Sequence, residues 1–298
     1  MNGKKFHKNI KVCSINDAPT ILNHHIISNQ ISNSFEYSDQ FKITDDFYPL
    51  FTKKVLHKSF FLFLNNNELI GTILLKEKKI SSNDNTLDCA CLGGIQIKKG
   101  HQGKGYFDFF FNKVLQKIKE QKTYDSIILW SDKEKLYSKF GFKPFGKIFW
   151  ANSHRPLLEI PKGYLKTSLQ NLTEKEFNEI KSLHLESYKN ISFDRDFDEW
   201  DEIKNISSME LFIKKNIEGE IKSYFIRGKG MDLQGVIHEY APLTEPLNTF
   251  SSYSHLSQRL SDDQCETLPA GLILYLNKEK SQGHFLENDI FFTGVDSI

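Results

Sequence analysis

The sequence is short of the residues that build disulfide frameworks and zinc sites. Its 298 residues include 4 Cys, and none of them forms a Cys-x-x-Cys pair or lies near histidines at ligand spacing. We therefore expect neither disulfides nor a metal site. Cys89 and Cys91 alternate on one face of a predicted strand, and this pattern favours buried thiols over a nucleophilic role.

A large charge of one sign and a long apolar run are also missing. The 39 Lys and Arg residues balance 38 Asp and Glu residues, and the lysines are spread through the chain. Attraction to nucleic acid needs a clustered basic face, so we expect no nucleic-acid partner. No apolar run approaches the length of a membrane span, and no apolar segment follows the basic residues 1–9. The sequence favours a cytoplasmic protein without a membrane partner, and it leaves the oligomeric state open.

The length of the chain is enough for two domains of ordinary size, each with its own core. The 25 Phe residues indicate cores that are built on phenylalanine. Turn-forming residues replace the periodic apolar pattern at 151–156. We therefore predict one domain over residues 1–152 and a second over residues 153–298.

Local patterns in the first part predict strands and helices in alternation. A helix begins near Asp17, which is a good capping residue, and a second helix covers roughly 45–57. Apolar runs at 60–64 and 69–75, joined by three asparagines, are typical of a hairpin.

A glycine-rich turn at 100–105 is the feature that organises the first domain. The apolar strand pattern before it ends near Ile97, and apolar residues at helical spacing follow from Phe107. Gly103 and Gly105 let the backbone come close to a ligand, and the first amides of a helix have no partner inside it. Such amides suit an anion, and a pyrophosphate is the favoured one.

Two motifs in this order resemble the GNAT superfamily of acyl-CoA N-acyltransferases. That family has a Gln/Arg-x-x-Gly-x-Gly/Ala loop between a strand and a helix, and a later short helix that reads Leu-Tyr-x-x-x-Gly-Phe. The second motif is complete at residues 136–142. The loop departs from the family at Gly100, where a phosphate contact is either missing or supplied by Lys98, Lys99 or Lys104. The resemblance implies an α/β fold with a mixed, mostly antiparallel sheet flanked by helices.

The resemblance also implies a cofactor, a reaction and site residues. The co-substrate is acetyl-CoA or another acyl-CoA, and the acceptor is an amine on a small molecule or a peptide. The residues that match the cofactor site are Ile95, Gln96, Ile97, Gln102, Gly103, Lys104, Gly105 and Tyr106. Tyr137 corresponds to the tyrosine that protonates the leaving thiolate, on the opposite side of its helix from core-facing Leu136 and Phe140. The alternative is a tyrosine that only packs.

The general base has several candidates in the sequence. Asp132 follows the strand that faces the cofactor, although a helix cap explains it better. Glu239 ends a strand in the second half, and a surface carboxylate is its alternative. Some tandem GNAT proteins place the chain terminus in the cleft, and here the Ile298 carboxylate, with Asp296, is the corresponding candidate. A loose final strand is the favoured alternative for that segment.

The second half repeats the order of the first but lacks its glycine loop. Thr173 and Glu176 form a capping-box signature, and two helices and a strand meander follow. Pro242 and Pro246 remove amides where a phosphate loop needs them. We therefore predict a degenerate GNAT-like domain without a cofactor site. Three functions stay open: an acyl-CoA N-acyltransferase, a silent acyl-CoA-binding regulator, and a tandem transferase of the aminoacyl type.

Overall fold

A computed structural model describes residues 10–35, 41–82, 85–151, 160–189, 192–230, 234–244, 255–257, 266–277 and 293–296. The first half contains β1 (Ile10–Cys13), α1 (His24–Phe35), α2 (Ile43–Asp46), η2 (Tyr48–Leu50), α3 (Lys53–Lys58), β2 (Phe60–Leu64), β3 (Leu69–Ser82), β4 (Asn85–Ile97), α4 (Tyr106–Gln121), β5 (Ser126–Leu129), α5 (Glu134–Tyr137), η3 (Ser138–Phe140) and β6 (Lys143–Ala151). The second half contains β7 (Leu165–Thr167), η4 (Leu169–Asn171), α6 (Glu174–Tyr188), α7 (Phe197–Lys204), β8 (Glu210–Lys215), β9 (Ile221–Arg227), β10 (Ile237–Ala241), β11 (His255–Ser257), β12 (Glu266–Tyr275) and η7 (Gly294–Asp296).

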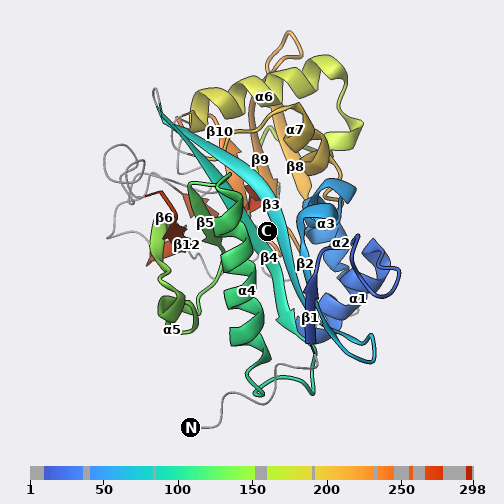
Figure 1. Cartoon of the computed structure of the whole chain (residues 1–298). Helices are drawn as coiled ribbons and strands as arrows, with labels where there is room; N and C mark the ends of the chain where they lie inside the picture. Colours follow the sequence, from blue (N-terminus) through green and yellow to red (C-terminus); the bar gives the residue numbers. More distant parts are fainter. Residues whose placement is uncertain are drawn as a thin grey trace.

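The strands among the described residues belong to one 12-stranded sheet in the order β1-β2-β3-β4-β5-β12-β6-β11-β10-β9-β8-β7. The pairs β4–β5 and β10–β11 are parallel, and the other pairs are antiparallel. Read from either edge, the sheet therefore shows the same series of three antiparallel pairs and one parallel pair. The predicted fold class, a mixed and mostly antiparallel sheet flanked by helices, is confirmed (Figure 1).

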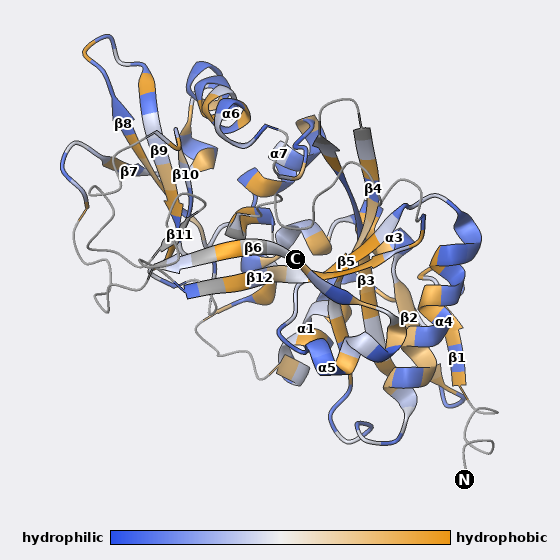
Figure 2. Cartoon of the chain, turned by 90° about the vertical axis from the view of Figure 1, so that its left-hand side faces the viewer, coloured by the Kyte–Doolittle hydropathy of each residue, from blue (hydrophilic) through white to orange (hydrophobic). Residues whose placement is uncertain are grey.

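The two halves of the chain exchange strands at the middle of the sheet. β12, from the second half, lies between β5 and β6, and β6, from the first half, lies beside β11. Figure 2 shows β6 and β12 running side by side between the two groups of strands. Leu272 pairs with Leu129 on one side of β12 and with Pro144 on the other. The domain boundary at residue 152 stays a prediction, because each half of the sheet holds a strand from beyond it.

Helices cover the two faces of the first half of the sheet (Figure 1). On one face, α4 buries a continuous apolar stripe that consists of Phe110, Phe111, Val114, Leu115 and Ile118. The other face is covered by α1 to α3, whose buried residues pack on Phe61, Phe63 and Leu74. The helical spacing of these residues in the sequence predicted the apolar stripe of α4. In the second half, the predicted capping box of α6 at Thr173 and Glu176 is present.

Two predicted helices differ from the structure. No helix begins at Asp17, and α1 begins only at His24. The helix predicted over 45–57 is divided into α2, η2 and α3, and Pro49 lies inside η2. Proline has no amide N–H and blocks a continuous α-helix, which explains the break.

A buried cluster of charges joins the two halves. Lys76 and Lys78, on β3, contact Glu199 on α7 at 2.9 and 2.8 Å. Lys78 also lies 3.2 Å from Asp296, near the end of the described chain. The Arg195 guanidinium, only 1% exposed, donates to Glu239 and to Asp296 at 3.1 Å each. These ions are mutually paired, which is the condition under which buried charges are tolerated.

Candidate active site

A large cavity among the described residues lies where β4 and β5 stop pairing. The last parallel pair is Leu92 with Leu129, and β4 continues to Ile97 with only β3 as its partner. The cavity has a volume of about 870 Å³ and is lined by residues of α1, the end of β4, the loop at 101–105 and residues 130–137. A volume of this size is typical of a ligand site.

A bulge in β4 opens this end of the sheet. The register between β3 and β4 shifts beyond Thr72, and Gly94 adopts a φ of +54°. The Thr72 hydroxyl donates to the Gly94 carbonyl at 2.7 Å, which holds the bulge. A side chain at Gly94 would place its Cβ 2.9 Å from Ile31, so glycine is required there for space as well as for φ.

The end of β4 leaves backbone groups beside the cavity. Between Gly93 and Ile97, no described strand pairs with the β5 side of β4. Backbone amides need a hydrogen-bond partner when they are covered, and a bound ligand can supply it. Ile95, Gln96 and Ile97, which the sequence predicted for the cofactor, all line the cavity.

The glycine-rich loop connects β4 to α4 and closes one end of the cavity. Gly103 and Gly105 have φ of +71° and +79°, and no atom lies within 4 Å of a Cβ at either position. Gly105 is the N-cap of α4, so the first amides of a 16-residue helix point toward this loop. Open space, left-handed glycines and free helix amides together suit an anionic group.

The other predicted loop residues have different roles. The Gln102 amide nitrogen donates to the Ile97 carbonyl at 3.0 Å and ties the loop to β4. The Lys104 ammonium donates to the Gly100 carbonyl at 2.7 Å, and Lys98 pairs with Glu68. Gln102, Gly103 and Gly105 line the cavity, whereas Lys104 and Tyr106 belong to the loop and the helix start without lining it.

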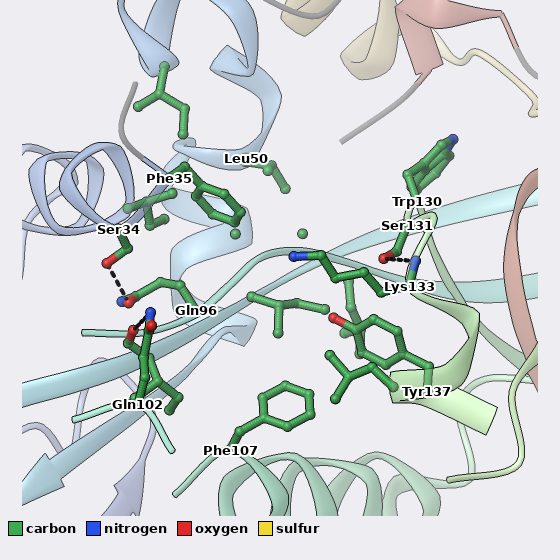
Figure 3. A pocket seen from close by; sticks show the side chains of 18 of the residues that line it. Ser34, Phe35, Leu50, Gln96, Gln102, Phe107, Trp130, Ser131, Lys133 and Tyr137 are labelled. Carbon is green, nitrogen blue, oxygen red and sulfur yellow. Dashed lines mark hydrogen bonds between the residues drawn. The ribbon is translucent and has the colours of Figure 1, made fainter. Parts of the chain in front are cut away.

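Tyr137 lies on the opposite side of the cavity from the end of β4 and points its hydroxyl inward (Figure 3). Its ring packs on Phe107 and Phe111, and burial raises the pKa of the phenol to about 12. No described residue forms a hydrogen bond with the hydroxyl. The predicted orientation of α5 was wrong, because Tyr137 is buried while Leu136 and Phe140 are only partly covered.

Asp132 and Lys133 form the loop that leads into α5. Asp132 is exposed, lines the cavity and does not cap the helix, so the capping interpretation is wrong. The N-cap is Lys133, whose backbone amide donates to the Ser131 hydroxyl at 3.1 Å. The Lys133 side chain extends into the cavity (Figure 3). Sequence reasoning missed Lys133, although its place between the Trp130 strand end and the tyrosine motif was a usable signal.

The other predicted carboxylates lie elsewhere. Glu239 and Asp296 are fully buried in the charge cluster and do not line the cavity. Ile298 lies outside the described residues, so its predicted role is untested. Lys229 links the segment before it to a residue of the cavity wall, because its ammonium donates to the Val295 carbonyl at 3.4 Å and lies 4.8 Å from the ring centroid of Phe47.

Cys89 and Cys91 are buried as the sequence predicted, and burial raises the pKa of the Cys89 thiol to about 12. In the described parts of the chain, no group of three or more His, Cys, Asp or Glu side chains is arranged to hold a metal ion. No helix among these residues has the length and hydropathy needed to cross a membrane.

A comparison with protein families identifies the part of the chain that carries this site. Residues 23–145 match the family described as Acetyltransferase (GNAT) domain. This part of the chain is a GNAT domain. The match runs from the residue before α1 into β6 and contains the bulged strand, the glycine loop and Tyr137. No curated protein matches the sequence.

Solved structures share the fold of the GNAT domain and of the rest of the chain. A protein of Enterococcus faecalis described as a probable N-acyltransferase is 13% identical, with a TM-score of 0.60 over 91% of this chain and 73% of that one. A GCN5-related N-acetyltransferase of Anabaena variabilis is 13% identical, with a TM-score of 0.59 over 91% and 74%. One of Kribbella flavida is 8% identical, with a TM-score of 0.58 over 92% and 72%. At these identities the likeness shows the fold alone.

The GNAT domain is completed by a strand from outside the matched residues. β12 begins at Glu266, far beyond residue 145, and yet it pairs with both β5 and β6. Gly271 makes this possible, because a Cβ there would come within 2.7 Å of the Leu129 carbonyl oxygen. The first half of the sheet therefore depends on the second half of the chain for its sixth strand.

Proposed function

We propose that this protein transfers an acyl group from acyl-CoA to an amine by direct attack of the amine on the thioester. The observation that carries the proposal is the single cavity that joins three features: the unpaired end of β4, the glycine loop before α4, and the inward hydroxyl of Tyr137. The match of residues 23–145 to an acetyltransferase domain supports the proposal. Acetyl-CoA is therefore the first co-substrate to test.

The residues of the cavity supply each step of this reaction. The loop amides near Gly103 and Gly105 hold the pyrophosphate, and the unpaired edge of β4 holds the pantetheine arm. Backbone donors of that edge stabilise the oxyanion that forms at the thioester carbon. The C–N bond forms, the C–S bond breaks, and Tyr137 gives its proton to the leaving sulfur. A phenol with a pKa of about 12 is fully protonated at neutral pH and can serve as this donor.

The amine must lose a proton, and Asp132 is the described carboxylate best placed to take it. Asp132 lines the cavity on the same loop that leads to Tyr137, and no described side chain forms an ion pair with it. Asp108 also lines the cavity, but it is paired with Lys139 at 2.6 Å. The Ile298 carboxylate remains the second candidate for this role. Asp132→Asn should lower turnover at saturating amine, with acetyl-CoA affinity retained.

The decisive experiment measures thiol release from acetyl-CoA in the presence of single amines. The panel contains amino acids, peptide amino termini, polyamines and aminoglycosides, and mass spectrometry of the product shows where the acetyl group is. We expect release of one thiol for each acetylated amine. Acetyl-CoA binding without transfer to any amine would instead support the silent acyl-CoA-binding regulator. Gly103 and Gly105 argue against the aminoacyl-type alternative, because transferases of that type generally lack an intact pyrophosphate loop.

A further inference from the structure

The acceptor side of the cavity has an apolar wall. Opposite Tyr137, the wall is built by α1, α2, η2 and the residues next to η2, and it contains Ile31, Phe35, Ile43, Phe47, Leu50 and Phe51. Figure 3 shows Phe35 and Leu50 directed toward the space above Tyr137. Phe35 is 52% exposed, which is a large apolar area to leave beside a cavity. Its burial against an apolar part of a ligand is favourable.

The polar groups that face this space are mainly hydrogen-bond donors. Gln96 is 6% exposed, and its side-chain oxygen accepts from the Ser34 hydroxyl at 2.9 Å. Its amide nitrogen is left buried without a partner among the described residues. The Lys133 ammonium points into the cavity toward the wall with Phe35 and Leu50, and no described residue pairs with it (Figure 3). Unsatisfied donors favour a ligand with acceptor oxygens.

Polycationic acceptors do not suit this cavity. Among the described lining residues the carboxylates are Asp108 and Asp132, and Asp108 is already paired with Lys139. A polyamine would therefore bring several charges to one available carboxylate and to the Lys133 ammonium, which repels them.

Taking the proposed function as its basis, we infer that the acceptor is an amino acid with an apolar side chain. The apolar wall takes the side chain, and the Lys133 ammonium takes the carboxylate. The α-amine then lies between Lys133 and Tyr137, where the thioester is presented. The N–C bond forms at the α-nitrogen, and the thiol of CoA leaves with the proton of Tyr137.

The test compares phenylalanine with phenethylamine, which has the same amine and ring but no carboxylate. We expect kcat/KM with acetyl-CoA to be about tenfold higher for phenylalanine, because its carboxylate forms a charge-assisted hydrogen bond with the Lys133 ammonium. In Lys133→Met this ratio should fall close to one. The matched control is Lys135→Met, which removes an exposed lysine of α5 that does not line the cavity, and it should keep the ratio of the natural protein.

Several results would overturn the inference. One is higher kcat/KM for spermidine than for phenylalanine, and another is an unchanged ratio in Lys133→Met. If Lys133→Met lowers kcat/KM equally for every acceptor and also weakens acetyl-CoA binding, Lys133 belongs to the cofactor site. Higher kcat/KM with octanoyl-CoA than with acetyl-CoA, without a preference for phenylalanine, would assign the apolar wall to the acyl chain.

A binding measurement separates this inference from the proposed function. Calorimetry with the product N-acetylphenylalanine, in the presence of CoA, reports the acceptor site without turnover. If no amine is acetylated but the product binds and Lys133→Met weakens that binding about tenfold, the inference holds and the proposed reaction fails. Acetylation of other amines, without binding of N-acetylphenylalanine, would support the proposed reaction and overturn the inference.

Discussion

The two halves of the sheet have the same order of strand pairs, but they use the end of the parallel pair in opposite ways. In the first half, β4 runs beyond β5 and opens a cavity of about 870 Å³. In the second half, β10 carries Glu239, which is fully buried beneath the Arg195 guanidinium and the Tyr224 hydroxyl. Among the described residues, the first parallel pair ends at a cavity, whereas the strand β10 of the second carries a carboxylate in a paired, buried cluster. Similar topology therefore does not imply a second site.

The polar groups of the two halves also differ in whether they have hydrogen-bond partners. At the first parallel pair, Tyr137, Gln96 and Lys133 keep donors that no described residue accepts. At the second, Arg195 donates to Glu239, Asp296 and Thr293. Unused donors are costly unless a ligand meets them, whereas a paired cluster stabilises the join between the halves.

The largest effect on this comparison should come from Gly105→Glu. The new carboxylate would lie at the N-terminus of α4, where the pyrophosphate is expected, and would repel it. Acetyl-CoA binding should be abolished in calorimetry. The control is Gly219→Glu in the second half, because Gly219 has a similar φ of +81° and equally open surroundings. Equal affinity in the two variants would remove the glycine loop from the site.

The next largest effect should come from Arg195→Met in the buried cluster. It leaves Glu239 and Asp296 without their main counter-charge, and breaking a buried pair costs about 3–5 kcal/mol of the free energy of unfolding. Denaturant unfolding measures this loss. Lys166→Met, which breaks an exposed pair with Glu210, should cost less than about 1 kcal/mol. Similar stability of the two variants would show that the cluster does not hold the halves together.

Tyr137→Phe should lower kcat by roughly 10²-fold, because the leaving thiolate loses its proton donor. Acetyl-CoA affinity and the fold should be nearly unchanged, since only a hydroxyl without a described partner is removed. Tyr164→Phe is the matched control in the second half, where the hydroxyl bonds to Ser223 at 2.9 Å. That variant should lose about 1 kcal/mol of stability and keep its kcat. A normal kcat in Tyr137→Phe would make Tyr137 a packing residue.

The smallest of these effects is a pH dependence of stability that comes from His238 in the second half. Burial lowers the pKa of His238 to about 4, so the folded protein keeps this ring neutral where the unfolded chain, with a pKa near 6.5, protonates it. The contribution of the neutral His238 ring to the free energy of unfolding is therefore fully present above about pH 6.5, and it is lost as the pH drops toward 4. Between pH 7 and pH 5 the loss should be about 2 kcal/mol.

Burial also lowers the pKa of His184, which adds to the loss in the same direction. Denaturant unfolding at pH 7 and pH 5, on the natural protein and on His238→Gln, measures the His238 contribution. The variant should show the smaller pH dependence. An identical pH dependence in both proteins would contradict the buried neutral His238.

Local signals in the sequence predicted the parts of the site that depend on neighbouring residues. The strand, glycine loop and helix at 91–118 follow from periodicity and from Gly103 and Gly105. The capping box at Thr173 follows from its spacing. The strand exchange was not predictable, because the pairing of Leu272 with Leu129 joins residues far apart in the sequence. Lys76 and Lys78 gave no sign of burial either, because their counter-charges come from α7 and η7.

The central claim is that only the first half binds acyl-CoA. Calorimetric titration of the intact chain with acetyl-CoA tests it most directly, because the stoichiometry counts the sites. The arrangement of the two halves predicts one molecule per chain. Two molecules per chain, one for each parallel strand pair, would contradict it.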